Sequence, residues 1–531
     1  MNIKPIATEY IKLSLVANPS EEEIKLLNSH KRVLTAWSSM GKRNIENIFK
    51  CIINHDNPSS IDVNTLNSIS SRDLKEIICD IFCNYIENNI EFFSLENSFV
   101  TQWSNSLDEL SEDAITSPKI NDFILKKYIE SRKTLMYKYI LDNHFSNRFL
   151  SNKLVILKGW SSATPIINSY FRQNYCNGGG FYININGTGI VIDPGCNFIK
   201  NMHEQGIRIF DINYIIITHN HIDHNASMME LQNLNYEYNN YISNNQKILK
   251  RKKLPNNPNV LTWIVDKETE EQINRNKDFS AKIDTTCIDE KGHTKSKQIQ
   301  INEIKTCTLP TNVQEEQANN CAPKRFLNHC NTQDIKIGQK EEIRITLFRT
   351  YHMKDSFGIK IRSKINALPF SLGYTSDTGY FKQLPQHLNG CDILIENISE
   401  LAKEDLSPNR IQDTANHLKL NGCIQTINQM KKSPQIAIIS EFWGGKDDIR
   451  LFIVNKIQEQ TRKVSKMEKG DEDGRNTKLL AADLGLTINL KDYSVKCSSC
   501  GEEVAAKTIS TSQDSKYGRL KYLCKRCNLI D

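Results

Sequence analysis

The sequence predicts an α/β domain that lies between an α-helical region and a small cysteine-rich module. Three observations indicate this arrangement. Apolar residues recur at helical spacing within residues 1–150, short apolar runs that end in turns fill residues 151–492, and two CxxC pairs lie within residues 493–531. At roughly 100–200 residues per domain, the 531 residues of the chain are enough for several domains.

The composition is that of an ordinary globular protein, with 39% hydrophobic and 24% charged residues. There is no apolar run of about 18 residues and no secretory signal at the N-terminus, so we expect a cytoplasmic protein without a membrane-spanning segment. The formal net charge of +6 is small for this length and is only a weak argument for nucleic-acid binding. In a reducing compartment, CxxC pairs indicate metal binding rather than disulfides.

Residues 1–150 are expected to form an α-helical N-terminal domain. Two apolar stripes at helical spacing support this expectation: Leu74, Ile77, Ile78, Ile81, Phe82 and Tyr85, and then Ile120, Phe123, Ile124 and Tyr128. These stripes are best explained by packing against one another. The region contains no catalytic constellation and is a candidate binding surface for a protein partner.

Short apolar runs after residue 150 predict the strands of the central domain. They are the run in LVILKGWSS, Phe181–Ile185 and Ile190–Ile192, Tyr214–Ile217, Val260–Val265, Ile343–Phe348, Phe357–Ile361, Ile393–Ile395 and Ile436–Ile439. Helical stretches such as Gly422–Met430 alternate with them, which is typical of an α/β fold. Residues 226–258 and 267–340 are rich in Asn, Gln and Lys and are predicted to be inserts. The basic residues of the first insert are either a solvated helix face or contacts to substrate phosphates.

The stretch ITHNHIDHN, residues 217–225, is the strongest chemical signal in the chain. It places three of only twelve histidines within six residues, directly after a predicted strand. Side chains two residues apart at a strand end project in the same direction, so His219 and His221 can bind one cation. Asp223 and His224 follow closely enough to reach a second cation. Imidazole and carboxylate ligands suit zinc, and also manganese or iron.

Five segments resemble the metallo-β-lactamase fold superfamily over about residues 153–492: GWSSATP, VIDPG, THNHIDHN, YHMKDSFGIKI and YTSDTGY. The resemblance implies an αββα sandwich. The opening segment, the DTG and the later NHLKLNG are similar to the nuclease and phosphodiesterase branch, which includes ribonuclease Z. The resemblance therefore implies a metal-dependent hydrolase with two divalent metals.

The ligands follow from the resemblance, position by position. His219, His221 and His352 would bind the first metal, and Asp377 would bridge the two metals. The second metal would be held by Asp223 and His224. Asp193 in VIDPG would support the site by accepting a histidine N–H group.

One position departs from the pattern of the branch. Glu441 stands where the branch has a histidine ligand after a strand. Either Glu441 binds the second metal, which would favour manganese over zinc, or Glu441 points away and His417 is the ligand. A third alternative is a weak or empty second site. If Glu441 is the ligand, His417 resembles the residue that protonates the leaving group or contacts the phosphate.

The function that the resemblance implies is phosphodiester hydrolysis by a metal-bridging hydroxide, with Asp223 and His417 as catalytic groups. Nucleic acid is the expected substrate. One alternative is a hydrolase of a small molecule such as a cyclic nucleotide or a phospholipid. Another is a non-catalytic metal-binding scaffold.

The last 39 residues, 493–531, are predicted to form a zinc-ribbon-like module. Its ligands would be Cys497, Cys500, Cys524 and Cys527. Four thiolates complete a tetrahedron around one structural zinc and leave no open position for catalysis. The module either contacts nucleic acid or protein, or stabilises the catalytic domain.

Overall fold

In the computed structural model, the chain divides into one unit of residues 1–141 and another of residues 142–531. The described residues are 20–22, 24–26, 30, 135–140, 151–161, 178–251, 257–288, 294–307, 309, 332–338, 342–401, 405, 416–443, 448–468, 477–513 and 519–529. Within the predicted helical domain, residues 21–22, 24–26, 30 and 135–140 are helical. The two apolar stripes predicted there lie outside the described residues.

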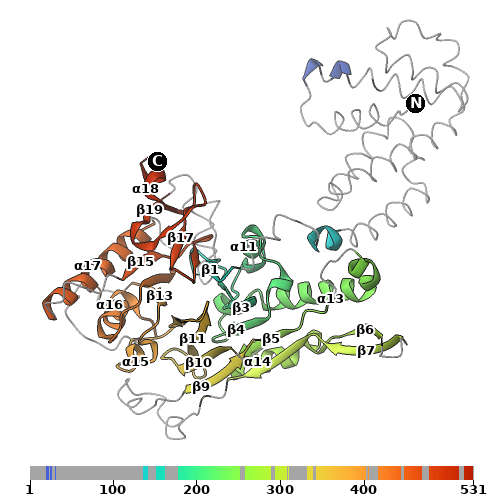
Figure 1. The fold of residues 1–531 in the computed structure, drawn as a ribbon, viewed down its shortest axis with the longest axis horizontal. Helices are drawn as coiled ribbons and strands as arrows, with labels where there is room; N and C mark the ends of the chain where they lie inside the picture. Colours follow the sequence, from blue (N-terminus) through green and yellow to red (C-terminus); the bar gives the residue numbers. More distant parts are fainter. Residues whose placement is uncertain are drawn as a thin grey trace, which may run out of the picture. The chain divides into compact units, whose positions relative to one another are not determined.

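Two mixed β-sheets form the centre of the second unit (Figure 1). The described part of the first sheet has the strand order β18 (Glu503–Ala505), β17 (Ser494–Lys496), β16 (Thr487–Asn489), β1 (Lys153–Ile156), β2 (Phe181–Ile185), β3 (Thr188–Ile192), β4 (Tyr214–Ile217), β5 (Leu261–Val265) and β8 (Asn302–Thr306). The described part of the second sheet has the order β15 (Lys478–Ala481), β14 (Ile436–Phe442), β13 (Ile393–Ser399), β12 (Leu368–Tyr374), β11 (Phe357–Ile365), β10 (Ile343–Arg349) and β9 (Thr332–Ile337).

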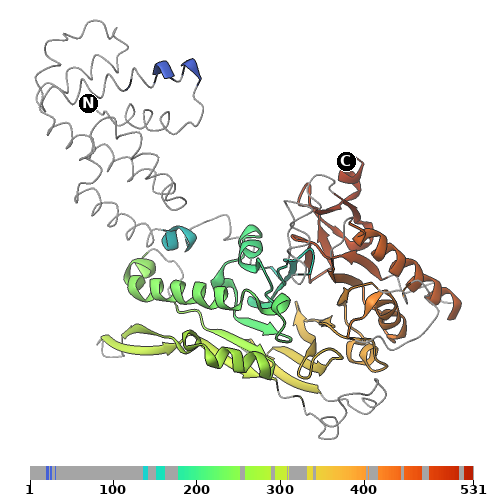
Figure 2. The same ribbon diagram turned by 180° about the vertical axis from the view of Figure 1, so that it is seen from behind.

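One hydrophobic core joins the two sheets face to face. Leu154, Phe181 and Ile190 from the first sheet and Leu347 and Leu372 from the second belong to the same buried cluster. Helices cover the second sheet, where α16 (Lys419–Gln429) packs on β13 and α17 (Arg450–Glu468) packs on β15, and Figure 2 shows the same arrangement from behind. This is the predicted αββα sandwich.

The first sheet is completed by a strand from the far end of the domain. β1 pairs antiparallel with β2 on one side and with β16 on the other, where Lys153 lies opposite Asn489. β16 then pairs with β17 and β17 with β18, so the sheet continues into the cysteine-rich module.

The parallel strands explain why the sequence signal was strong in the middle of the sheets. β4 pairs parallel with β3 and β5, and β13 pairs parallel with β12 and β14. Such strands are buried on both faces and appear as continuous apolar runs. The predicted strands are confirmed, but β13 and β14 extend further than predicted, to Ser399 and Phe442. All of the added residues are buried, and most of them are polar: Glu396, Asn397 and Ser399 in β13, and Ser440 and Glu441 in β14.

The segment 226–258, predicted to be an insert, contains the crossover helix between the parallel strands β4 and β5. This helix, α13 (Met228–Arg251), buries Leu231 and Tyr238. Its asparagines bind backbone: Asn239 exchanges two hydrogen bonds with Asn259, of 2.7 and 2.9 Å. Part of the polar composition of this segment therefore belongs to Asn235 and Asn239, which are buried and bind the backbone of Asn259 before β5. The basic residues Lys250 and Arg251 at the end of the helix are exposed.

The segment 267–340 contributes strands to both sheets. It contains α14 (Lys267–Arg275), the hairpin of β6 (Lys282–Ile288) and β7 (Thr294–Gln300), and the edge strands β8 and β9. β8 pairs parallel with β5, and β9 pairs antiparallel with β10. Among the described helices, none is long and apolar enough to cross a membrane.

Candidate metal centre

The predicted site residues gather where several strands end. Asp193 follows β3, His219 follows β4, and Asp377 follows β12. The backbone is in the left-handed region at Asp193, Ser376 and Glu441, with φ of 50°, 55° and 59°. Non-glycine residues rarely adopt this conformation, and such strain is concentrated at functional sites. Here Asp193 directly follows β3, Ser376 lies just beyond β12, and Glu441 is the last residue but one of β14.

Three histidines converge on one point. His219 Nε2 lies 3.1 Å from His221 Nδ1, and His352 Nε2 lies 3.1 Å from the same atom. Two nitrogen ligands of a tetrahedral zinc ion, each about 2.0–2.1 Å from the metal, lie roughly 3.3 Å apart. The three ring nitrogens therefore have the spacing of a metal-binding set.

Asp377 lies between this set and the neighbouring groups. Its Oδ2 is 3.9 Å from His352 Nε2 and 3.6 Å from His224 Nε2. Its Oδ1 accepts a 2.8 Å hydrogen bond from Asn397 Nδ2, which fixes the carboxylate. Although burial raises the pKa of Asp377, the neighbouring histidines outweigh burial and lower the pKa well below its usual range. The carboxylate thus lies among the ring nitrogens of His219, His224, His352 and His417, and its bridging of two metals stays a prediction.

Asp193 organises the site from behind, as predicted. Its Oδ2 accepts from His224 Nδ1 at 2.8 Å and from the Tyr374 hydroxyl at 2.7 Å. Its Oδ1 accepts the Thr218 backbone N–H at 2.8 Å. Because Nδ1 of His224 donates to this carboxylate, its Nε2 faces the cluster, where it is buried without a hydrogen-bond partner. An orphaned buried ring nitrogen of this kind fits a metal or a substrate proton.

His352 is oriented in the same way by a backbone group. Its Nδ1 lies 3.1 Å from the Asn416 carbonyl oxygen, so Nδ1 is the donor and Nε2 is the free ligand atom. Burial lowers the pKa of His352, and burial lowers the pKa of His219 well below its usual value. Both imidazoles are therefore neutral near pH 7, which is the form that binds a metal.

The structure brings both Glu441 and His417 into the site. Glu441 lies in one metal-capable group with Asp223 and His224, and His417 lies in another with His352 and Asp377. His417 Nδ1 is 3.8 Å from Asp377 Oδ2. The carboxylate of Glu441 does not point away, and His417 lies beside His352, with ring centres 5.0 Å apart.

A lysine that the sequence analysis did not assign to the site, Lys158, forms a fully buried ion pair with Glu441. Burial alone would lower the pKa of Lys158, but the Glu441 carboxylate outweighs this effect and raises it, so the ammonium is charged. The first ligand set fits a metal, whereas the second contains a carboxylate that is already neutralised by an ammonium. The only sequence signal for Lys158 was a lysine directly after the apolar run LVIL.

The loop that carries Lys158 is held on three sides. Leu157 N donates to Gly180 O and Ser161 N donates to Phe442 O, both at 2.9 Å. Gly179 has φ +104°, and a Cβ there would lie 1.8 Å from the Leu157 carbonyl oxygen. The glycine run before β2 therefore permits a close approach that any side chain would prevent.

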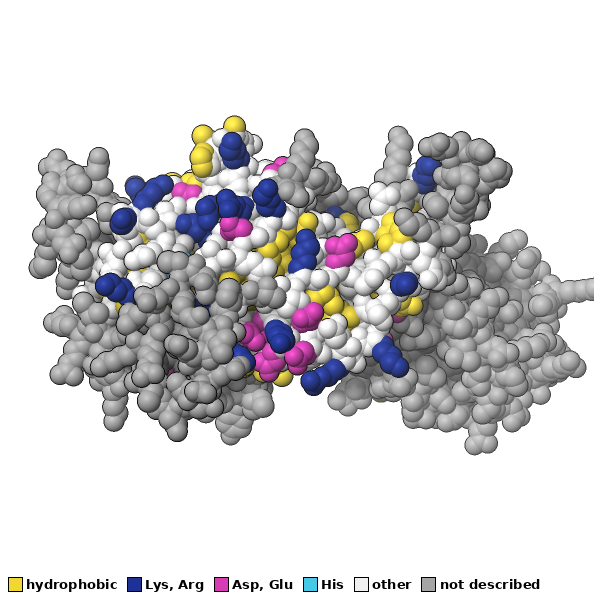
Figure 3. Space-filling view, turned by 90° about the horizontal axis from the view of Figure 1, so that it is seen from below, with side chains coloured by type: hydrophobic (Ala, Val, Ile, Leu, Met, Phe, Trp, Pro, Cys, Tyr) yellow, Lys and Arg dark blue, Asp and Glu magenta, His cyan; other side chains and the backbone are white. Residues whose placement is uncertain are grey.

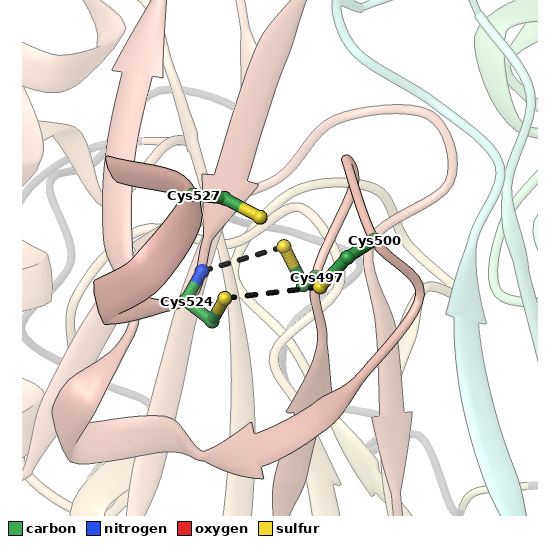
Figure 4. A group of neighbouring side chains, drawn as sticks. All are labelled: Cys497, Cys500, Cys524 and Cys527. Carbon is green, nitrogen blue, oxygen red and sulfur yellow. Dashed lines mark hydrogen bonds between the residues drawn. The ribbon is translucent and has the colours of Figure 1, made fainter. Parts of the chain in front are cut away.

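The four predicted cysteines also come together (Figure 4). Cys500 Sγ and Cys524 Sγ are 3.8 Å apart, which matches the roughly 3.8 Å between sulfur ligands of a tetrahedral zinc with Zn–S bonds of about 2.3 Å. The Cys524 backbone N–H donates to Cys497 Sγ at 3.4 Å. Burial raises the pKa of the Cys497 thiol, but backbone N–H donors outweigh burial and lower it to about 6. In the same cluster, the hydrogen bond with the Cys500 side chain raises the pKa of the Cys527 thiol to about 12, so what indicates a metal is the convergence of the four sulfurs.

The cysteine module is bound to the sandwich by buried polar contacts. In β20 (Leu520–Leu523), the Leu520 backbone N–H donates to Asp483 Oδ2 at 2.6 Å. The same carboxylate oxygen is 3.2 Å from Arg450 Nη1. Arg450 donates to the Gly159 carbonyl oxygen at 3.1 Å and lies 4.5 Å from the Trp160 ring centre. A short chain of contacts thus links the module to the loop of Lys158.

The geometry can be compared with known proteins. Residues 180–235, which include β2 to β4 and the histidine motif, match the metallo-beta-lactamase superfamily model. The match covers these residues and no more of the chain. The fold implies divalent metals, and the histidine–aspartate cluster and the four cysteines could each bind metal.

Among curated proteins, uncharacterized protein MJ1374 of Methanocaldococcus jannaschii is 33% identical over 105 residues, which are 19% of this chain and 36% of the relative. Among solved structures, the metallo-beta-lactamase fold protein YhfI from Bacillus subtilis is 12% identical, with a TM-score of 0.39, and covers 63% of this chain and 97% of its own. The short form of human tRNase Z is 10% identical, with a TM-score of 0.34, and covers 64% of this chain and 99% of its own. At these similarities, neither structure carries information on the substrate of this chain.

Proposed function

We propose that the protein is a metal-dependent phosphodiesterase that acts on nucleic acid. The observation that carries the proposal is a cluster of metal-capable side chains with a further histidine beside it. His219, His221 and His352 present three ring nitrogens for a divalent metal next to Asp377, and His417 Nδ1 lies 3.8 Å from Oδ2 of the same carboxylate. A metal site with a separate histidine poised beside it suits a reaction that needs both an activated water and a proton donor.

A divalent metal bound here would supply a water of lowered pKa and stabilise negative charge on phosphate oxygens. The chain provides the rest. Asp223 is buried, and its Oδ2 faces Ser161 Oγ at 3.4 Å, so it can accept a hydrogen bond from the attacking water and orient it. Asn397 holds Asp377 in place from the side away from the histidines.

His417 is the group that would protonate the departing alkoxide. Its Nδ1 is buried and has no hydrogen-bond partner, so a substrate oxygen at the cluster can take that position. Histidine is the side chain that most often transfers protons in such steps. His219 and His352 differ from His417 in this respect, because their Nδ1 atoms contact Thr218 Oγ1 and the Asn416 carbonyl oxygen.

An exposed aromatic ring beside the cluster supports a substrate with bases. Trp443 is 41% exposed, and its ring centre lies 6.1 Å from that of His417. Exposed aromatic rings next to a phosphate site are platforms on which nucleobases stack. Trp443 is therefore the candidate contact for a base adjoining the cleaved phosphate.

A nucleotide-sized phosphodiester is the second candidate substrate. A long polyanion gains affinity from many phosphate contacts, whereas a nucleotide makes few. Figure 3 shows Lys and Arg side chains gathered over part of the described face, with Asp and Glu side chains among and below them. The predicted cytoplasmic location and a protein partner for residues 1–150 stay predictions.

The cysteine module would hold one structural zinc. All four sulfurs point to one centre, so no position is left for substrate. Its role in this proposal is to stabilise the sandwich through Asp483 and Arg450.

The test is hydrolysis by the purified full chain, after removal of metal and addition of zinc or manganese. The substrates are bis-p-nitrophenyl phosphate, cyclic nucleotides and single-stranded RNA and DNA. We expect phosphodiester cleavage that disappears in His221→Ala. Binding of RNA that weakens steeply with salt would support nucleic acid, whereas a shallow slope would support a small substrate. Absence of cleavage of every phosphodiester by the metal-loaded protein would contradict the proposal.

A further inference from the structure

The ion pair between Lys158 and Glu441 lies where the superfamily resemblance places a second metal. Glu441 belongs to the same group of ligand atoms as Asp223 and His224, all within 4.8 Å of one another. Lys158 Nζ binds Glu441 Oε2 inside this group, and both side chains are essentially inaccessible to solvent, at 1% and 0%. The cation that the structure shows beside Glu441 is an ammonium of the chain itself.

Lys158 cannot leave this position easily. Its neighbours Leu157 and Ser161 are tied by backbone hydrogen bonds to Gly180 and Phe442, and Arg450 holds the carbonyl oxygen of Gly159. Glu441 is equally constrained because it lies inside β14, which is buried along its length. Separating the pair would leave an unpaired charge in the interior, which is strongly unfavourable.

Together, Lys158 and Glu441 replace the histidine that the related branch has at the position of residue 441. A neutral histidine at residue 441 would need no counter-charge, whereas a carboxylate there does, and Lys158 supplies it. A dication bound to Asp223, His224 and Glu441 would lie next to this ammonium, and like charges at such a distance repel in the interior. The second site therefore has the carboxylates of a metal site, but the Lys158 ammonium already supplies a positive charge there.

We propose that the centre binds one metal ion, at His219, His221, His352 and Asp377, and that the Lys158 ammonium takes the place of the second. The inference rests on the proposed function only for the location of the first ion. It concerns metal content, so it stands or falls independently of whether the substrate is a phosphodiester.

Two buried atoms could still bind a second ion, so the experiment can contradict the proposal. His224 Nε2 and Glu441 Oε1 have no hydrogen-bond partner, and a second ion would satisfy both. The full chain is stripped of metal, loaded with excess Mn²⁺ and examined by electron paramagnetic resonance, because two neighbouring Mn²⁺ ions give an exchange-coupled spectrum and a single ion does not. We expect the uncoupled spectrum in the wild-type chain. A coupled spectrum would overturn the proposal.

A matched variant tests the role of Lys158 directly. In the double variant Lys158→Met, Glu441→His, both buried charges are removed together, which avoids the unpaired charge of either single change. We expect it to bind one additional ion per chain by elemental analysis and to show the coupled spectrum. An unchanged metal content in the folded double variant would contradict the assignment of Lys158. The zinc at the four cysteines is common to both proteins and cancels in the comparison.

Discussion

The histidine–carboxylate cluster and the cysteine cluster both gather metal ligands, but they differ in what remains unsatisfied. In the first, His224 Nε2, His417 Nδ1 and Glu441 Oε1 are buried without partners. In the second, four sulfurs face one another, and Cys497 Sγ also receives a backbone N–H. The first cluster therefore has atoms that can still bind a substrate. In the second, the four sulfurs can fill every ligand position of a structural ion.

The same difference appears in how the ligands are supported. Asp193, Asn416 and Asn397 hold the ring nitrogens and the carboxylate of the first cluster from behind. The cysteines are arranged by two short backbone turns instead. Substitutions should therefore affect chemistry at the first cluster and folding at the second.

The largest expected effect is on catalysis, from Asp377→Asn. The change removes the charge that lies between the ligand groups, and we expect turnover to fall on the order of 10³-fold or more. The melting temperature should change little, because the amide keeps the volume and the neighbours of the carboxylate. Steady-state rates with bis-p-nitrophenyl phosphate measure the effect, with Asp278→Asn, an exposed position, as the control. Full activity in Asp377→Asn would show that the cluster is not the reaction centre.

At the other cluster, Cys527→Ser should destabilise the chain by several kcal/mol, because a structural zinc site contributes its binding free energy to folding. The activity of the molecules that remain folded should be largely retained. Thermal unfolding and zinc content are the measurements, and Cys196→Ser, outside the cluster, is the control. If Cys527→Ser kept its stability and its zinc, the closed structural site would be refuted.

His417→Gln sharpens the distinction within the first cluster, between ligands and a proton donor. We expect a fall of about 10²–10⁴-fold for an alkyl phosphodiester and a much smaller fall for a p-nitrophenyl ester. The nitrophenolate leaves without needing a proton, so its hydrolysis does not depend on a general acid. Metal content should stay at the wild-type level. Equal losses with the two substrates would argue against proton donation by His417.

The smallest expected effect comes from Asp193→Asn, which changes support but no ligand. The amide no longer accepts fully from the backbone N–H and the hydroxyl of Thr218, whose Oγ1 lies 3.2 Å from Nδ1 of the ligand His219. We therefore expect metal affinity to fall about 10–100-fold. Competition with a chelator measures the affinity. Asp266→Asn is the matched control, because Asp266 is also buried but caps α14 away from the cluster. The same loss in both variants would indicate a general change in the fold rather than support of the metal.

The sequence predicted the parts of the site that are close together in the chain. His219, His221, Asp223 and His224 follow from spacing after a buried strand, because strand geometry alone directs neighbouring side chains to one place. His352 could be assigned only through the resemblance, since nothing local links it to residues 219–224. Distance in sequence is the physical reason for this limit.

Lys158 shows what spacing and resemblance both missed. Its importance comes from a pairing with Glu441, a residue on the other sheet, and from burial that an isolated lysine would not tolerate. The polar ends of β13 and β14 were missed for a related reason: Asn397 and Glu441 do not look like strand residues, although they are buried in strands at the site. Asn235 and Asn239 of α13 likewise do not look like core residues, although both are buried.

The pairing of β1 with β16 has a consequence for synthesis of the protein. During translation, the first strand of the domain emerges long before the strand that covers its outer edge. Until residues 487–489 leave the ribosome, that edge presents free N–H and carbonyl groups to other chains. Contacts between such distant segments slow folding and prolong exposure to aggregation. We therefore expect chaperone availability during expression to affect the yield of native protein.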